Sequence, residues 1–125
     1  MSRETITADG APEPAGPYSH AVLANDFDVS GQGPVDPETG FAPDVFQDQV
    51  SQTFRNVRTI LEAAGSGLEQ VVKVNVYLTD LTRFARFNEV YEEFFHTEPP
   101  ARTTVGAALL GILVEVDCVA VVKQP

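Results

Sequence analysis

The chain has 125 residues, of which eight are lysine or arginine and eighteen are aspartate or glutamate, so its formal net charge is −10. A surface this negative disfavours binding to nucleic acid or to an anionic membrane, because both require clustered basic side chains. We therefore expect neither as a partner. Any small anion that binds has to be held locally by a particular arginine.

The length fits a single domain spanning residues 1–125, with enough chain to build one hydrophobic core. Cys118 is the one cysteine, which excludes an internal disulfide and favours a reducing compartment. No apolar stretch near the start resembles a signal peptide, and the longest apolar run, 105–114, is about half the length of a membrane span. We expect a soluble, cytoplasmic protein.

The first third of the chain predicts strands and loops. A short strand at 5–7 precedes a loop at 8–17 that is rich in proline and glycine. The strand-like runs 20–24 and 27–30 flank Asn25-Asp26, which predicts a hairpin with a two-residue turn. Glycines follow the second arm, and they indicate a sharp turn or the close approach of another group.

Two amphipathic helices are expected. Apolar residues recur at helical spacing in the first one: Val50, Phe54, Val57, Leu61 and Ala64. Asp44 and Gln47 resemble a capping box at its start. The second helix is predicted from 83 to about 96, after an N-cap at Asp80 or Thr82, and it ends before a pair of prolines.

Strands at 68–78, 103–109 and 113–123 complete an α+β pattern, with about six strands in one mixed sheet and two helices on one face. In the last strand one side is wholly apolar: Val114, Val116, Cys118, Ala120 and Val122. The other side is still mostly apolar: Leu113, Glu115, Asp117, Val119 and Val121. A sheet that is apolar on both faces needs a second cover, so we expect another copy of the chain in a closed symmetric assembly. The residue pattern leaves the copy number open.

Arg102 and Glu115 each lie in an otherwise apolar strand, where a charge needs a partner, a ligand or a shifted pKa. Arginine can hold a carboxylate through two parallel hydrogen bonds, so Arg102 is either a ligand-binding residue or half of an ion pair with Asp117 or another carboxylate. Glu115 either orients or deprotonates water, or it pairs with Arg102 or with a backbone amide across a subunit boundary. Asp117 lies on the same face and could either act on water or serve as such a pairing partner.

Other candidates are less specific. Ser30 and Gly31 present a hydroxyl and exposed backbone to a ligand, or they form an ordinary strand-ending turn. Tyr18 is either the wall of a pocket or an aromatic residue at the core edge. Asn88 lies among aromatic residues in the second predicted helix, where an amide needs something to bind. The two histidines have no companions at ligand spacing, so we expect no metal site.

Taken together, these motifs resemble the RidA family, also called the YjgF family, of reactive-intermediate (imine) deaminases. The resemblance covers almost the entire chain, and its strength lies in the order and spacing of the set. The matching segments are 16–18 (GPY), 30–35 (SGQGPV), 56–65 (NVRTILEAAG), 72–81 (VKVNVYLTDL), 87–95 (FNEVYEEFF), 100–103 (PART) and 114–120 (VEVDCVA).

The resemblance implies a chorismate-mutase-like α+β fold and a homotrimer with three sites in clefts between subunits. It also implies cofactor-free hydrolysis of 2-imino acids, or of their enamine tautomers, to 2-oxo acids and ammonia. In the family pattern the arginine at Arg102 holds the substrate carboxylate and the acid at Glu115 positions the attacking water. Pocket positions of the family match Tyr18, Ser30, Gly31 and Asn88.

Two departures from the family pattern leave the substrate range open. Thr104 stands where many members have a cysteine that lines the pocket, and the connection 107–112 is shorter than usual. One alternative is therefore a related deaminase of a catabolic, aminomuconate-like intermediate. Another is a non-enzymatic trimer that binds small carboxylates. A ribonuclease role fits the net charge of −10 poorly.

Overall fold

A single mixed sheet forms the centre of the molecule. The computed structural model describes residues 3–24 and 26–121, without the side chains of 26–28 and 30. The strand order is β1-β2-β3-β6-β4-β5. Only β4 and β5 pair in parallel, and every other neighbouring pair is antiparallel. The strand bounds are β1 (Glu4–Ile6), β2 (Ala21–Ala24), β3 (Asp26–Gln32), β4 (Val71–Leu78), β5 (Ala101–Gly106) and β6 (Val114–Val121).

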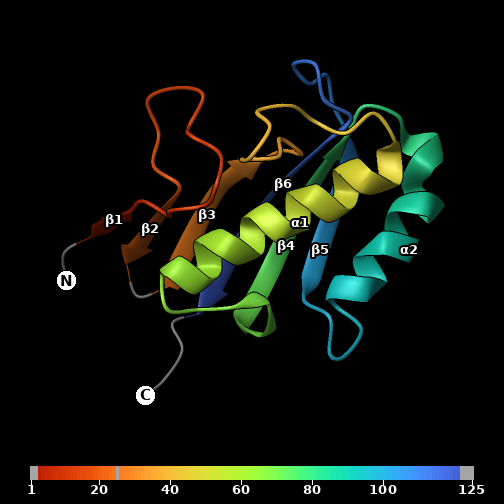
Figure 1. Ribbon diagram of the computed structural model, residues 1–125. Coiled ribbons are helices and arrows are strands. Elements are labelled where there is room, and N and C mark those ends of the chain that lie inside the picture. The colour runs from red at the N-terminus through yellow and green to blue at the C-terminus, as the bar shows by residue number, and fades with distance from the viewer. Residues whose placement is uncertain (1–2, 25, 122–125) are drawn as a thin grey trace.

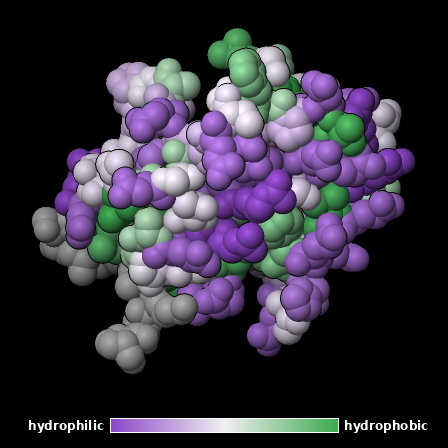
Figure 2. Space-filling model, viewed as in Figure 1, coloured by the Kyte–Doolittle hydropathy of each residue, from purple (hydrophilic) through white to green (hydrophobic). Residues whose placement is uncertain are grey.

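Both helices, α1 (Phe46–Ala63) and α2 (Phe84–Phe94), cover the same face of this sheet (Figure 1). The fully buried Phe54 of α1 joins them, because its ring lies within 6.0 Å, centroid to centroid, of four other aromatic rings. Those rings belong to Phe87, Tyr91, Phe94 and Phe95. The outer surface of the helices is largely hydrophilic (Figure 2), as expected for amphipathic helices. The predicted α+β architecture, with two helices on one face, is confirmed.

The last strand separates the two faces of the sheet as its alternation predicts. Its buried residues lie beneath the helices: Val114, Val116, Cys118 and Ala120. Glu115, Asp117 and Val119 are half-buried on the opposite side, which we call the open face. The expected continuation of this strand to 123 lies outside the described residues.

The predicted capping box at the start of the first helix is wrong. The helix begins at Phe46, after an extended Val45, and no side chain caps it. Asp44 is therefore one residue too early to accept a hydrogen bond from the first turn. The N-cap predicted for the second helix is wrong for α2 itself, whose N-cap is Arg83 without a side-chain hydrogen bond. Asp80 instead caps the turn before α2, because its carboxylate accepts a hydrogen bond from the backbone N–H of Thr82. This cap starts a short 3-10 turn, Leu81–Arg83, which precedes α2.

The predicted hairpin is present, but its turn differs from the expectation. Asp26 is the first residue of β3 and pairs with Ala24, whereas Asn25 lies outside the described residues. The third strand extends to Gln32, because Gln32 pairs with Val116 of β6 after an irregularity in the ladder. The fifth strand ends at Gly106, earlier than predicted, since its parallel partner β4 also ends there, at Leu78.

Candidate functional site

One cavity, of about 730 Å³, lies on the open face of the sheet around Glu115. The loop 12–18, the end of β3, Tyr77 and the 107–112 connection line it. This connection is the loop at the top of Figure 1, and Figure 2 shows apolar atoms in the same place. Leu110 there is 97% exposed. The cavity therefore combines two carboxylates, Glu13 and Glu115, with a mostly apolar rim.

Glu115 lies with its carboxylate against the backbone of Gly31. A β-carbon at Gly31 would overlap Oε2 of Glu115, so any other residue would force the carboxylate to move. Burial raises the pKa of Glu115, and the negative charge of Asp117 raises it further. A carboxylate with a raised pKa is a stronger base once it is ionised.

Asp117 lies on the same face and is held by two neutral donors of β4. Nδ2 of Asn75 donates to Oδ1 of Asp117 at 2.8 Å, and the hydroxyl of Tyr77 donates to Oδ2 at 2.9 Å. Within the described residues of one chain, Asp117 forms no ion pair with Arg102. Asn75 and Tyr77 were not predicted as site residues, although their alternation with buried valines places them on the open face.

Tyr18 reaches this cavity from the loop that precedes β2. Its side chain is 46% exposed, and its hydroxyl accepts a hydrogen bond from the backbone N–H of Ala15. Buried His20 anchors the loop, because its Nδ1 accepts from the N–H of Ala8 at 2.9 Å and its Nε2 donates to the carbonyl of Pro12 at 2.7 Å. Tyr18 is therefore a wall of the pocket. The backbone of Ser30 belongs to β3 beside Gly31, but the Ser30 side chain lies outside the described part of the chain.

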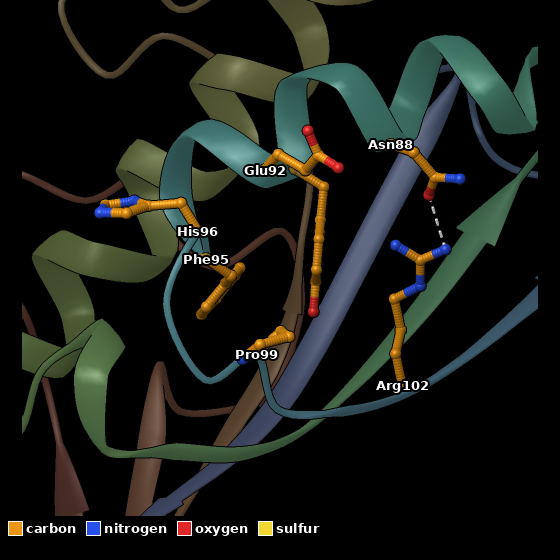
Figure 3. Close-up of a pocket in the computed structure, with 7 residues that line it drawn as sticks. Asn88, Glu92, Phe95, His96, Pro99 and Arg102 are labelled. Carbon is orange, nitrogen blue, oxygen red and sulfur yellow. Dashed lines mark hydrogen bonds between the residues drawn. The ribbon is translucent and has the colours of Figure 1, made fainter.

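Arg102 lines a second cavity, of about 510 Å³, beside α2. Its Nη2 donates to Oδ1 of Asn88 at 2.7 Å, and Figure 3 shows the two side chains pointing toward each other from β5 and α2. The guanidinium carbon also lies 4.6 to 5.3 Å from the centroids of three aromatic rings. Those rings belong to Phe84, Phe87 and Tyr91.

The guanidinium is thus oriented by an amide and by the faces of aromatic rings. Among residues 3–24 and 26–121, Arg102 has no carboxylate within ion-pair distance. We expected Asn88 to bind something because it lies among aromatic residues, and its partner within the chain is Arg102. Burial raises the pKa of Tyr91 to about 12, so its phenol stays neutral beside the arginine.

The two cavities lie on opposite faces of the sheet. Arg102 pairs with Val74, whose side chain is buried beneath the helices, whereas Glu115 pairs with Tyr77 on the open face. One chain therefore does not bring Arg102 and Glu115 together. Thr104 lies two residues beyond Arg102 on the same face of β5, outside the lining of the Arg102 cavity.

The described residues contain neither a cluster of metal ligands nor a membrane-spanning helix. No three histidine, cysteine, aspartate or glutamate side chains in this part of the chain gather closely enough to hold a metal ion. None of its helices is both long enough and apolar enough to cross a membrane.

Known proteins resemble this chain over nearly its full length. A family model described as Endoribonuclease L-PSP matches residues 8–122. A RutC family protein of Pyrococcus horikoshii is 43% identical, over 94% of this chain and 97% of that protein. The Arabidopsis thaliana protein named Reactive Intermediate Deaminase A, chloroplastic, is 37% identical over 96% of this chain and 66% of that protein.

The solved structures agree with these sequence matches. The crystal structure of E. coli TdcF with bound serine has a TM-score of 0.90 and 37% identity, covering 96% of this chain and 99% of that one. The ligand bound in that structure is an amino acid. With a family model matched over 8–122 and relatives at this identity, the chain belongs to the YjgF/RidA/RutC family.

Proposed function

We propose that this protein is an imine deaminase, which hydrolyses 2-imino acids or their enamine tautomers to 2-oxo acids and ammonia without a cofactor. One observation carries the proposal: the chain holds a pre-oriented guanidinium at Arg102 and a half-buried carboxylate with a raised pKa at Glu115. The names of two relatives support it, since one is a reactive intermediate deaminase and the other binds serine, an amino acid with a free carboxylate.

The proposed reaction needs only these two groups and water. Arg102 holds the substrate carboxylate through two parallel hydrogen bonds, while Asn88 keeps the guanidinium in place. Glu115 takes a proton from water as the water oxygen bonds to the imine carbon, and the C=N electron pair moves to nitrogen. The proton then passes to the nitrogen, which gives a tetrahedral amino alcohol. Glu115 next transfers the hydroxyl proton to the same nitrogen, so that the C–N bond breaks and ammonia leaves as the carbonyl forms. Positioning and proton transfer each contribute on the order of 10²-fold or more.

The proposed assembly is a homotrimer with its sites between subunits. Arg102 and Glu115 of one chain lie on opposite faces of its sheet, so one substrate molecule can contact both groups only if a second copy supplies one of them. The half-buried residues on the open face, such as Val119, favour a cover from another copy. We propose a cytoplasmic location from the single free cysteine, although the Arabidopsis relative is named chloroplastic.

The test is a coupled assay in which an amino-acid oxidase or dehydratase makes the imine in the presence of the purified protein. Serine, threonine, leucine and aromatic precursors are compared. We expect ammonia and 2-oxo acid to appear faster than in buffer. Arg102→Ala should abolish this acceleration without changing the size of the assembly. No acceleration with any precursor would contradict the proposal.

Two other functions have some support. The serine-bound relative favours a carboxylate-binding protein without turnover, which the assay would reveal as binding without product. The short 107–112 connection favours a different substrate, such as an aminomuconate-like compound. The family description names an endoribonuclease, but a net charge of −10 opposes RNA binding, and incubation with RNA tests this directly.

A further inference from the structure

The open face of the sheet carries a second carboxylate that the proposed reaction does not use. Asp117 has a fixed position, because Asn75 donates to one of its oxygens and Tyr77 to the other. Both donors are neutral, so they hold Asp117 without cancelling its charge. The nearest lysine along β4, Lys73, donates instead to Oγ1 of Thr103 at 2.8 Å.

This fixed charge lies next to the proposed base. Asp117 and Glu115 are two residues apart on β6, so their side chains project from the same face. Tyr77 lies directly opposite Glu115 in the ladder, lines the cavity around it, and reaches across to Asp117. The hydrogen bond to Asp117 is the largest cause of the raised pKa of Tyr77, so the phenol keeps its proton and remains a donor.

We propose that Asp117, held by Asn75 and Tyr77, is a positioning residue that keeps a negative charge beside Glu115 and so favours proton uptake by Glu115 during catalysis. The inference rests on the proposed function, since it concerns the base of that reaction. The raised pKa of Glu115 agrees with this inference, because the charge of Asp117 adds to the effect of burial. Asp117 itself need not touch the substrate.

Other groups that face Glu115 are few. The loop 12–18 contributes Glu13 and Tyr18 to the lining of the cavity, and β4 contributes Tyr77. The described residues of β3 in this lining are Gly31 and Gln32, which carry no charge, and the 107–112 connection supplies only apolar side chains and backbone. Within one chain, Asp117 is therefore the group that a titration of Glu115 has to isolate, with Glu13 as the second carboxylate to compare. In the proposed assembly, Arg102 of a second copy would add the same positive charge in every variant compared.

The experiment is a carbon-detected NMR titration of the full chain, labelled at the carboxyl carbon of glutamate. The Glu115 signal is assigned by its absence in Glu115→Gln. In Asp117→Asn the midpoint of this signal should move to lower pH than in the wild type. In Asp117→Glu, which restores the charge, it should stay near the wild-type value. Asp117→Ser also removes the charge and serves if the asparagine variant does not fold.

Two controls complete the test. Thr103→Ala removes a hydrogen bond from the same face and should leave the midpoint unchanged, as should Glu13→Gln if Asp117 is the dominant charge. In the imine assay, the acidic limb of the pH–rate profile of Asp117→Asn should move with the NMR midpoint, and kcat should fall while KM changes little. An unchanged Glu115 midpoint in both neutral variants would overturn the inference. Absence of deaminase activity in the wild type would overturn the proposed function instead, because the titration does not depend on turnover.

Discussion

Arg102 and Glu115 belong to one sheet but face away from each other. Arg102 lies beneath α2 with its guanidinium bonded to Asn88, and Glu115 lies on the open face against the backbone of Gly31. A six-stranded sheet separates the two groups, so a small molecule bound to one chain cannot touch both. If both act on one substrate, they have to come from different copies of the chain.

This arrangement predicts complementation between two inactive variants. Arg102→Ala and Glu115→Gln should each lack deaminase activity, whereas an equal mixture, unfolded and refolded together, should regain activity. In randomly assembled trimers an intact site needs the arginine of one variant and the glutamate of the other, so about a quarter of the wild-type rate is expected. The coupled imine assay on the refolded mixture measures this fraction.

The control for this prediction is each variant refolded alone, which should stay inactive. Size-exclusion chromatography before and after mixing checks that the assembly is the same in all samples. A mixture as inactive as its components would mean that both groups act from one chain. That result would contradict a site shared between subunits.

The strand periodicity predicted much of this architecture. Alternation in 114–120 separated the buried side from the side of Glu115, and the rarity of charges in apolar strands singled out Arg102 and Glu115. Their placement on opposite faces was not predictable, because the face of Arg102 depends on its register with Val74 in a parallel pair. That register is set by tertiary packing and leaves no local pattern in the sequence.

Local polar residues were predictable only where their setting was unusual. Asn88 attracted notice because an amide among aromatic residues needs a partner, and Arg102 is that partner. Asn75 and Tyr77 did not stand out in the sequence, because polar residues that alternate with valines are typical of an ordinary solvated strand face. The prediction of a capping box was wrong. Asp44 and Gln47 have the spacing of that motif, but the helix starts at Phe46 with Val45 as its N-cap.

Gly31→Ala should lower kcat about 10²-fold, the size of effect expected when a catalytic group is displaced by about 1 Å. The added methyl group would overlap the carboxylate of Glu115 and push it from its place. The coupled imine assay measures the loss. Gly67→Ala is a matched control, because its β-carbon would also meet a carboxylate, that of exposed Glu69 at 2.7 Å. Normal activity in Gly31→Ala would show that the position of Glu115 is not critical.

Asn88→Asp should raise KM about tenfold and change kcat much less. The new carboxylate would keep the hydrogen bond to Arg102 but would neutralise the guanidinium, so it competes with the substrate carboxylate; hydrogen bonds to charged groups contribute about 1.5–3 kcal/mol. Initial rates across a range of imine concentrations give both constants. Gln47→Glu adds the same charge at the start of α1, and it should leave KM unchanged. An Asn88→Asp variant with normal KM would place the carboxylate site elsewhere.

Glu115→Gln should be more stable than the wild type near neutral pH, although we expect it to be inactive. The pKa of Glu115 is raised in the folded protein, so between the unfolded and folded pKa values the folded state binds more protons and its stability falls as pH rises. Glutamine never carries the charge that is unfavourable above this window. Thermal unfolding should therefore give a higher Tm for the variant at pH 7–8, and the difference should vanish below the ordinary glutamate pKa of about 4.3. Glu93→Gln, exposed on α2, should show no such pH-dependent gain. A stability difference that stays constant across this pH range would mean that the charge of Glu115 is not what destabilises the folded protein.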